Sequence, residues 1–212
     1  MQKNVEKMSI NYSPNFNLKK RSASKVKYLI FHYTGMKSEN GAIKRLTNIK
    51  SGVSCHYFIK KNGKVIKIVP DLYVAWHAGV SSWKKDVSLN TNSIGIEISN
   101  PGHYHGYKNF NQSQIKSIIS LSKKLKKKYK IKKENILGHS DIAPLRKKDP
   151  GEKFPWKLLH RKKISLWHSL SEKKCKQYRN IMLKDNREFF KLLFQFGYKF
   201  TKNSSEKIKI YK

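Results

Sequence analysis

The stretch around which this chain is organised is GHSDIAPLRKKDPG, residues 138–151. Its internal proline and its Pro-Gly pair interrupt any helix, so we expect an ordered loop, and ordered loops on a rigid scaffold often carry functional groups. His139 and Asp149 offer an imidazole nitrogen and a carboxylate oxygen, which both suit zinc. A surface loop in which these two side chains only form hydrogen bonds fits the stretch equally well.

Length and composition limit the class of protein. With 212 residues the chain can form one substantial core, with room for a small appended domain. Aromatic residues make up 12%, which indicates a packed protein although the formal net charge is +34. That charge favours polyanionic partners, but it is almost all lysine. Arginine, the residue that reads bases and phosphates in a bidentate manner, is scarce, and this disfavours a nucleic-acid-binding protein.

The cysteines and the N-terminus suggest a compartment. Cys55 and Cys175 are far apart and neither belongs to a CxxC pair, which is compatible with a reducing environment. Residues 1–20 contain no apolar segment of a secretory signal, and no run approaches the roughly 18 apolar residues of a spanning helix. We therefore expect a cytoplasmic protein without a transmembrane segment, with the cell envelope as the alternative.

Two apolar runs each carry a polar residue that needs an explanation. Residues 26–31 (VKYLIF) predict a buried strand that ends at His32, and sites in α/β proteins collect at such strand ends. Residues 92–99 (NSIGIEIS) predict another strand with Glu97 between two isoleucines. A buried carboxylate is costly unless it is paired or functional. Gly95 would share its face and leave room for a ligand, whereas an edge strand would simply turn Glu97 to solvent.

The remaining pattern alternates between strands and helices. Two β-rich runs around Asn62-Gly63 predict a hairpin, and residues 112–129 predict an amphipathic helix with a capping box at Asn111 and Gln114. Further elements are expected at 40–49 (helix) and 135–137 (strand). This alternation predicts an α/β domain that ends near residue 168.

Residue types alone suggest a metal centre. His32, His139 and Asp149 would provide three ligands and leave the fourth tetrahedral position open, as in catalytic rather than structural zinc sites. Glu97 would then serve as general base, and Lys147 would stabilise a developing oxyanion. The corresponding reaction class is metal-assisted amide hydrolysis.

Five segments in this order resemble the type 2 zinc-dependent N-acetylmuramoyl-L-alanine amidases, which include phage amidase-lysozymes and peptidoglycan recognition proteins. They are FHYTG (31–35), SCHYFIKKNGKV (54–65), AWHAG (75–79), NSIGIEISNPG (92–102) and GHSDIAPLRKKDPG (138–151). The order and spacing are most similar to the bacterial AmpD and AmiD branch, and the resemblance covers about residues 25–160.

The resemblance implies a fold and an activity. The fold is a mixed central β-sheet flanked by helices, with zinc at the base of a groove. His32, His139 and Asp149 match the zinc ligands, with Asp149 where phage relatives have cysteine, and Glu97 and Lys147 match the catalytic pair. The implied reaction cleaves the amide between the lactyl group of N-acetylmuramic acid and the L-alanine of the stem peptide, in peptidoglycan or in anhydro-muropeptides, as part of cell-wall turnover and muropeptide recycling.

Four further residues are candidates for substrate binding. Trp76, His77 and Trp83 would line the groove, where aromatic rings stack on sugar or peptide, with core packing as the equal alternative. Asn100, just past Glu97, would contact the stem peptide.

The chain divides into three predicted parts. Residues 1–24 read as an extended, weakly structured lead, 25–168 as the zinc amidase domain, and 169–212 as a short helical extension with helices at 171–182 and 186–196. The extension is either a degenerate peptidoglycan-binding domain or a helical hairpin that packs on the amidase domain, because the charged tail 201–212 offers little for a third helix.

Other functions fit the sequence less well. A non-catalytic peptidoglycan-binding module would share the fold, but the ligand positions, Glu97 and Lys147 are all present and favour an enzyme. A basic nucleic-acid-binding protein would bind in a salt-dependent manner without zinc, and no nucleic-acid motif is visible. We expect a monomer that acts on peptidoglycan or a muropeptide.

Overall fold

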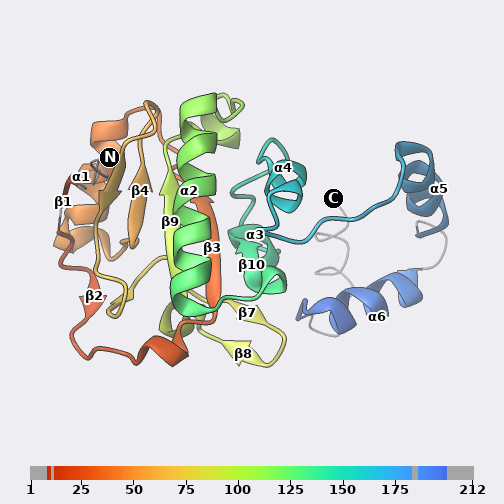
Figure 1. Cartoon of the computed structure of the whole chain (residues 1–212), viewed down its shortest axis with the longest axis horizontal. Coiled ribbons are helices and arrows are strands. Elements are labelled where there is room, and N and C mark those ends of the chain that lie inside the picture. Colours follow the sequence, from red (N-terminus) through yellow and green to blue (C-terminus); the bar gives the residue numbers. More distant parts are fainter. Residues whose placement is uncertain (1–8, 11, 183–185, 200–212) are drawn as a thin grey trace, which may run out of the picture.

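A mixed six-stranded sheet forms the centre of the molecule (Figure 1). The computed structural model describes residues 9–10, 12–182 and 186–199. Within this sheet only the β4–β5 pair is antiparallel, and the other neighbouring pairs run parallel. In spatial order the strands are β1 (Ser9–Ile10), β5 (Val65–Lys67), β4 (Tyr57–Ile59), β9 (Ser93–Ile98), β3 (Tyr28–Tyr33) and β10 (Ile136–Gly138).

Helix α2 (Gln112–Tyr129) covers one face of the sheet, as the long green helix in Figure 1 shows. It begins with the predicted capping box, in which the Asn111 side chain accepts from the Gln114 backbone and the Gln114 side chain accepts from the Asn111 backbone. Its apolar stripe packs on the odd-numbered residues of β3, Leu29 and Phe31, and on the three isoleucines of β9. Helix α4 (Trp156–Arg161) joins this core through Leu159.

The opposite face of the sheet carries helices α1 (Glu39–Thr47) and α3 (His139–Ile142). Tyr28 and Ile30 of β3 pack there with Ile142 of α3, in a cluster separate from the one under α2. Because side chains alternate along a strand, His32 follows Ile30 on this second face. The functional side chains therefore emerge on the side of the sheet away from α2.

Most predicted elements are confirmed, with small shifts at their ends. The helix at 112–129 and the hairpin around Asn62-Gly63 are present, and the mixed sheet flanked by helices is the expected fold. The strand predicted at 26–31 begins two residues later, at Tyr28. The stretch 138–151 is not a loop throughout, because its first residues form α3, in which the Asp141 side chain accepts from the Gly138 backbone.

The expectation of a weakly structured lead is wrong for the described part of residues 1–24. Strand β1 pairs with β5, and β2 (Phe16–Asn17) pairs with β6 (Val74–Ala75). The side chains of Asn15 and Arg21 are buried and donate to backbone carbonyls far along the chain. These hydrogen bonds tie the lead to the domain, a connection that its polar composition does not reveal.

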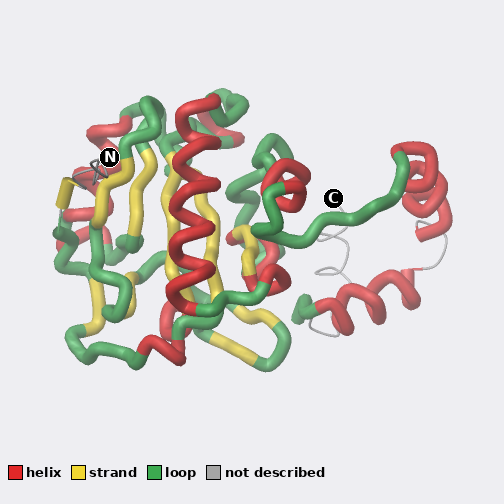
Figure 2. The backbone as a smooth tube through the Cα atoms, viewed as in Figure 1, coloured by secondary structure: helices red, strands yellow, loops and turns green. Residues whose placement is uncertain are grey.

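The C-terminal helices α5 (Glu172–Met182) and α6 (Asn186–Phe196) follow an extended segment that leaves the sheet domain (Figure 2). The chain then returns: the Lys84 backbone donates to the Gly197 carbonyl at 2.7 Å, and the Tyr198 hydroxyl donates to Asp141 Oδ1 at 2.5 Å. Whether 169–212 is a degenerate wall-binding domain stays a prediction, and the tail 201–212 lies outside the described residues.

The remaining elements are short. Strands β7 (Ser82–Trp83) and β8 (Asp86–Val87) form a small hairpin. The 3₁₀ helices are η1 (Ala23–Lys25), η2 (Ile49–Ser51), η3 (Leu89–Asn92), η4 (His103–His105) and η5 (Lys133–Asn135). None of the helices in the described ranges is long and apolar enough to cross a bilayer.

Candidate metal centre and substrate groove

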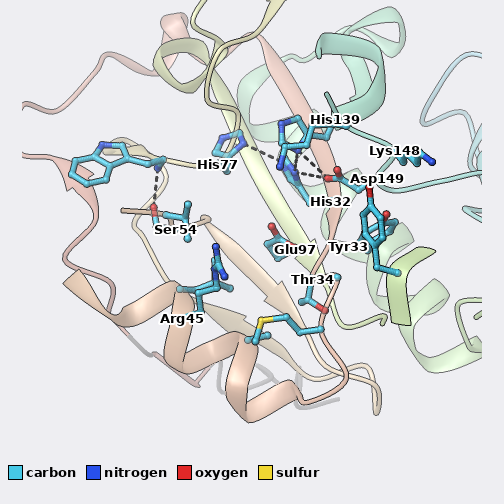
Figure 3. A pocket seen from close by; sticks show the side chains of 18 of the residues that line it. His32, Tyr33, Thr34, Arg45, Ser54, His77, Glu97, His139, Lys148 and Asp149 are labelled. Carbon is cyan, nitrogen blue, oxygen red and sulfur yellow. Dashed lines mark hydrogen bonds and ion pairs between the residues drawn. The ribbon is translucent and has the colours of Figure 1, made fainter. Parts of the chain in front are cut away.

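The two central parallel strands bring His32 and Glu97 together. Strands β3 and β9 pair with His32 directly opposite Glu97 in the register, near the C-terminal ends of both strands. Residues opposite each other on neighbouring strands point to the same face of the sheet. The spacing of the two apolar runs thus places the imidazole and the carboxylate side by side (Figure 3). Both lie on the face away from α2, because the alternate residues of the two strands pack against that helix.

The third strand of this group delivers His139. Strand β10 lies parallel to β3 with Gly138 opposite Phe31, so His139, the next residue, begins α3 beside His32. Asp149 returns to the same place because its backbone carbonyl accepts from the Ser140 backbone at 2.8 Å. The stretch 138–151 therefore closes on itself and offers both of its candidate ligands to one point.

Three donor atoms meet at that point. His32 Nδ1 lies 2.9 Å from His139 Nδ1, and each of these nitrogens lies 3.0 Å from Asp149 Oδ2. Ligands of a tetrahedral zinc, each about 2.0–2.1 Å from the ion, are about 3.3 Å apart. Two imidazole nitrogens and one carboxylate oxygen this close together can hold a divalent cation, and zinc accepts all three of these donors.

The protonation states are those that metal binding requires. Burial, with a contribution from the neighbouring His139, lowers the pKa of His32 to about 4, so this imidazole is neutral at pH 7. Burial opposes ionisation of Asp149, but the contacts with His139 and His32 outweigh it and hold the pKa of the carboxyl group below its usual range. A neutral imidazole and an ionised carboxylate bind a cation without first losing a proton.

Glu97 presents a half-buried carboxylate to the cavity that contains the metal centre. Its Oε2 is buried and has no hydrogen-bond partner among the described residues. Burial, together with the charge of Asp149, raises the pKa of Glu97 well above its usual value. A group placed beside a metal centre with its proton affinity raised is suited to accept a proton during a reaction.

The centre lies in a cavity of about 350 Å³, which is large enough for part of a sugar-peptide ligand. Seven of the nine residues predicted for the site line it: His32, His139, Asp149, Glu97, Lys147, Trp76 and His77. The catalytic and substrate-binding roles of these residues stay predictions. Arg45, Arg146 and Lys148 add positive charge to the wall, which favours an anionic ligand.

His77 is buried and packs beside the metal centre. Its imidazole lies against both His32 and His56, and it contacts the strand β9 at Gly95. Burial, with smaller effects of His32 and His56, lowers the pKa of His77 well below its usual value, so the ring is neutral. Gly95 does leave room on the Glu97 face, as expected, but a side chain of the protein occupies that room.

Two predicted substrate-binding residues lie elsewhere. Trp83 is 1% exposed and packs against Tyr198, so its indole is not available to a ligand in the groove. Asn100 is buried, and its amide group donates to the Lys108 carbonyl and accepts from the Gly102 backbone. Asn100 thus shapes the loop beside the site, and neither residue lines the cavity.

Sequence reasoning missed Arg45 and Arg146 as parts of the site. Arg45 lies on α1, whose periodic pattern shows only that the residue is on the surface. Arg146 lies in the quoted stretch as a member of its basic cluster, and its guanidinium donates to the carbonyls of Ala78 and Val80 at 2.8 and 2.7 Å. Only this contact with the distant segment 78–80 shows that Arg146 belongs to the cavity wall.

Comparison with known proteins agrees with this geometry. The family model described as N-acetylmuramoyl-L-alanine amidase matches residues 22–152. The chain is 38% identical over 155 residues to N-acetylmuramoyl-L-alanine amidase AmiD of Escherichia coli, covering 68% of this chain and 55% of that protein. It is 39% identical over 105 residues to 1,6-anhydro-N-acetylmuramyl-L-alanine amidase AmpD of Haemophilus influenzae, covering 49% and 55%. The chain thus spans about half the length of these curated relatives.

Solved structures show the same fold. The E. coli AmiD complex with the substrate anhydro-N-acetylmuramic acid-L-Ala-D-gamma-Glu-L-Lys superposes with a TM-score of 0.74 at 32% identity, covering 88% of this chain and 77% of that one. AmpDh3 of Pseudomonas aeruginosa in complex with anhydromuramic pentapeptide also gives 0.74, at 27% identity, covering 96% and 82%.

Proposed function

The chain belongs to the N-acetylmuramoyl-L-alanine amidase family, and from this premise we propose that it hydrolyses the amide between the lactyl group of N-acetylmuramic acid and the L-alanine of a stem peptide. The observation that carries the proposal is the convergence of His32 Nδ1, His139 Nδ1 and Asp149 Oδ2 at the base of a cavity that also holds Glu97. A metal centre with an unpaired carboxylate beside it is the arrangement that hydrolysis of an amide needs.

We assign zinc to the three donor atoms. When bound there, zinc would polarise the substrate carbonyl and lower the pKa of water. The protein holds these atoms together from separate elements, since His32 comes from β3, His139 from the start of α3 and Asp149 from the end of the quoted stretch. This assembly requires the folded domain.

Glu97 moves the proton in the proposed mechanism. Its carboxylate takes a proton from the attacking water as the water oxygen bonds to the lactyl carbonyl carbon. The same proton then passes to the alanine nitrogen as the carbon–nitrogen bond breaks, so that a carboxylic acid and a free amine are formed. The Lys147 ammonium lies in the cavity wall and stabilises the negative charge that develops on the carbonyl oxygen.

Positive charge in the groove supports an anionic stem peptide as the ligand. Arg45, Arg146 and Lys148 line the cavity together with Lys147. Stem peptides carry free carboxylates, and the ligands named for the AmiD and AmpDh3 complexes are anhydromuramic peptides. We therefore propose soluble anhydro-muropeptides as substrates of this chain, with polymeric peptidoglycan as the other candidate.

Mass spectrometry of 1,6-anhydro-muropeptides after incubation with zinc-supplemented protein tests this function. Release of stem peptide that begins at L-alanine is the expected result. Glu97→Gln is the matched control because it keeps the size of the side chain and removes the proton acceptor, and it should lower the rate about 10²–10⁴-fold. Its zinc content should equal that of the wild type.

Parallel incubation with whole sacculi separates the two substrates. Cleavage of sacculi with intact anhydro-muropeptides would assign the enzyme to the polymeric wall. If neither substrate is cut while zinc is bound, the amidase proposal fails and a peptidoglycan-binding module takes its place.

A further inference from the structure

His77 and Ala78 contact the Nε2 atoms of the two ligand histidines, which are the ring nitrogens that face away from Asp149. His32 Nε2 lies 3.1 Å from His77 Nδ1, and His139 Nε2 lies 3.1 Å from the carbonyl oxygen of Ala78. In both histidines Nδ1 is the atom that faces Asp149. The segment 77–78 therefore contacts each ligand histidine through the ring nitrogen that does not face Asp149; Figure 3 shows the contact between His77 and His32.

The contact with Ala78 determines which nitrogen of His139 carries the proton. A carbonyl oxygen only accepts hydrogen bonds, so His139 Nε2 must donate. In the neutral form that binds a metal, an imidazole has one proton, so donation from Nε2 leaves His139 Nδ1 with a lone pair directed at the other two donor atoms. Arg146 also donates to the Ala78 carbonyl, at 2.8 Å, and helps to fix its direction.

A longer relay determines the proton on His32. The Ser93 hydroxyl donates its only proton to the Leu89 carbonyl at 2.5 Å, so at its 3.2 Å contact with His77 Nε2 it accepts. His77 Nε2 therefore carries the proton of this neutral ring, and His77 Nδ1 is an acceptor. His32 Nε2 must then donate to His77, which leaves the lone pair of His32 Nδ1 pointing at His139 and Asp149.

The segment itself is held on two sides. The Asn90 side-chain oxygen accepts from the backbone N–H groups of both His77 and Ala78, at 3.0 and 2.7 Å. The His77 ring lies so close to β9 that a Cβ atom at Gly95 would be 2.5 Å from His77 Nδ1. Neither the backbone nor the ring of His77 is free to shift away from His32.

We propose that His77 and Ala78, supported by Ser93 and Asn90, form a positioning element that presets both ligand histidines with Nδ1 deprotonated toward the metal. The inference rests on the proposed function, because it assumes that His32, His139 and Asp149 hold zinc. Outer hydrogen bonds of this kind fix the tautomer and the orientation of a ligand histidine and typically change metal affinity 10–100-fold. His77 is thus assigned to positioning within the site rather than to contact with substrate.

A matched pair of variants tests the role of His77. Asparagine and leucine have the same number of side-chain heavy atoms and the same branching at Cγ, but only asparagine keeps an oxygen acceptor near the position of His77 Nδ1. His77→Leu should weaken zinc binding about 10–100-fold in competition with a chromophoric chelator, whereas His77→Asn should lose only a few-fold. Equal zinc affinity in the two variants would overturn the proposal.

Nitrogen-15 NMR of the histidine side chains gives an independent readout that does not depend on activity. In metal-free wild-type protein, His32, His77 and His139 should all show the tautomer with the proton on Nε2. Ser93→Ala, which removes the acceptor for His77 Nε2, should introduce the other tautomer of His77. If His77 in the wild type carries its proton on Nδ1, the relay is refuted, even where His77→Leu fails to fold.

These measurements separate the inference from the proposed function. Wild-type protein that binds zinc but cleaves no muropeptide would refute the amidase and leave the positioning element in place. If the wild-type protein cleaves muropeptides but His77→Leu binds zinc with unchanged affinity, the amidase proposal stands and the positioning element is refuted. Thermal unfolding of each metal-free variant controls for a general loss of structure.

Discussion

Replacement of Gly95 by alanine is the most direct perturbation of the contact between His77 and the sheet. A Cβ atom at this position would meet the His77 ring at Cγ, at Nδ1 (2.5 Å) and at Cδ2 (2.6 Å). Carbon atoms in van der Waals contact are about 3.5–4.0 Å apart, so the overlap is about 1 Å. Gly95 lies on β9 between β4 and β3, and the paired backbone on both sides prevents the strand from moving. The imidazole must move instead.

The expected cost follows from these contacts. Overpacking of a buried site costs about 1–3 kcal/mol, and loss of the two hydrogen bonds of the His77 ring adds about 1 kcal/mol each. Alanine recovers about 0.4–1 kcal/mol by restricting the unfolded chain. The net destabilisation is about 2–4.6 kcal/mol, which in a chain of this length lowers Tm by about 4–18 °C.

Thermal and urea unfolding of the metal-free protein measure this effect, with Gly41→Ala as control. Gly41 lies in α1, and the nearest atom to an added Cβ is 3.3 Å away, so alanine there should be neutral or stabilising. The clash should be relieved in the double variant Gly95→Ala/His77→Ala, whose destabilisation should be smaller than the sum of the single ones. A Gly95→Ala protein as stable as Gly41→Ala, or additive single effects, would refute the proposed contact.

Three further predictions concern stability and metal dependence. Asp71→Asn should cost about 2–4 kcal/mol at pH 7, because the buried carboxylate accepts from Tyr57, Tyr129 and Lys128. Burial opposes ionisation of Asp71, but these hydrogen bonds hold its pKa below that of the unfolded chain. The difference in free energy of unfolding between wild type and variant, measured with urea, should therefore be constant above about pH 5 and shrink below about pH 4. A difference that grows with acidification would contradict this prediction. Tyr198→Phe removes a donor to the half-buried carboxylate of Asp141 and should lower the free energy of unfolding by about 1–3 kcal/mol; an unchanged urea midpoint would show that the C-terminal return does not anchor to the domain. Treatment with a chelator should abolish muropeptide hydrolysis and added zinc should restore it, and full activity of the zinc-free protein would exclude the metal centre from the reaction.

Local patterns in the sequence predict the parts of the fold that depend on neighbours in the chain. The helix at 112–129 follows from one apolar stripe and a capping box three residues apart, and both hydrogen bonds of that box are present. The positions of His32 and Glu97 follow from the apolar runs that precede or enclose them, because strand ends and strand registers then bring the two side chains together. The strand pattern and parallel pairing are therefore enough to predict that His32 and Glu97 are neighbours.

Features that depend on one specific distant contact could not be predicted in this way. Gly95 indicates a close approach to the sheet, but the sequence does not show that the approaching group is His77. For Trp83 the sequence leaves the groove and the core equally open, and the structure buries its indole against Tyr198. Tyr198 follows two helices whose contact with the domain the local pattern does not specify. Arg45 enters the cavity wall from a helix whose sequence indicates only an exposed face.

Position and protonation of the ligands come from different parts of the molecule. Strands β3 and β10 fix the backbone positions of His32 and His139. The strand pairing does not determine which of the two ring nitrogens carries the proton. The segment after β6 makes that choice, through hydrogen bonds that span 45 residues to His32 and 61 residues to His139. A non-catalytic relative could keep the strands without this segment. The presence of His77 and Ala78 behind the complete ligand set therefore favours an enzyme over a binding module, because a binding module has no need for outer-shell hydrogen bonds that increase the affinity for a metal.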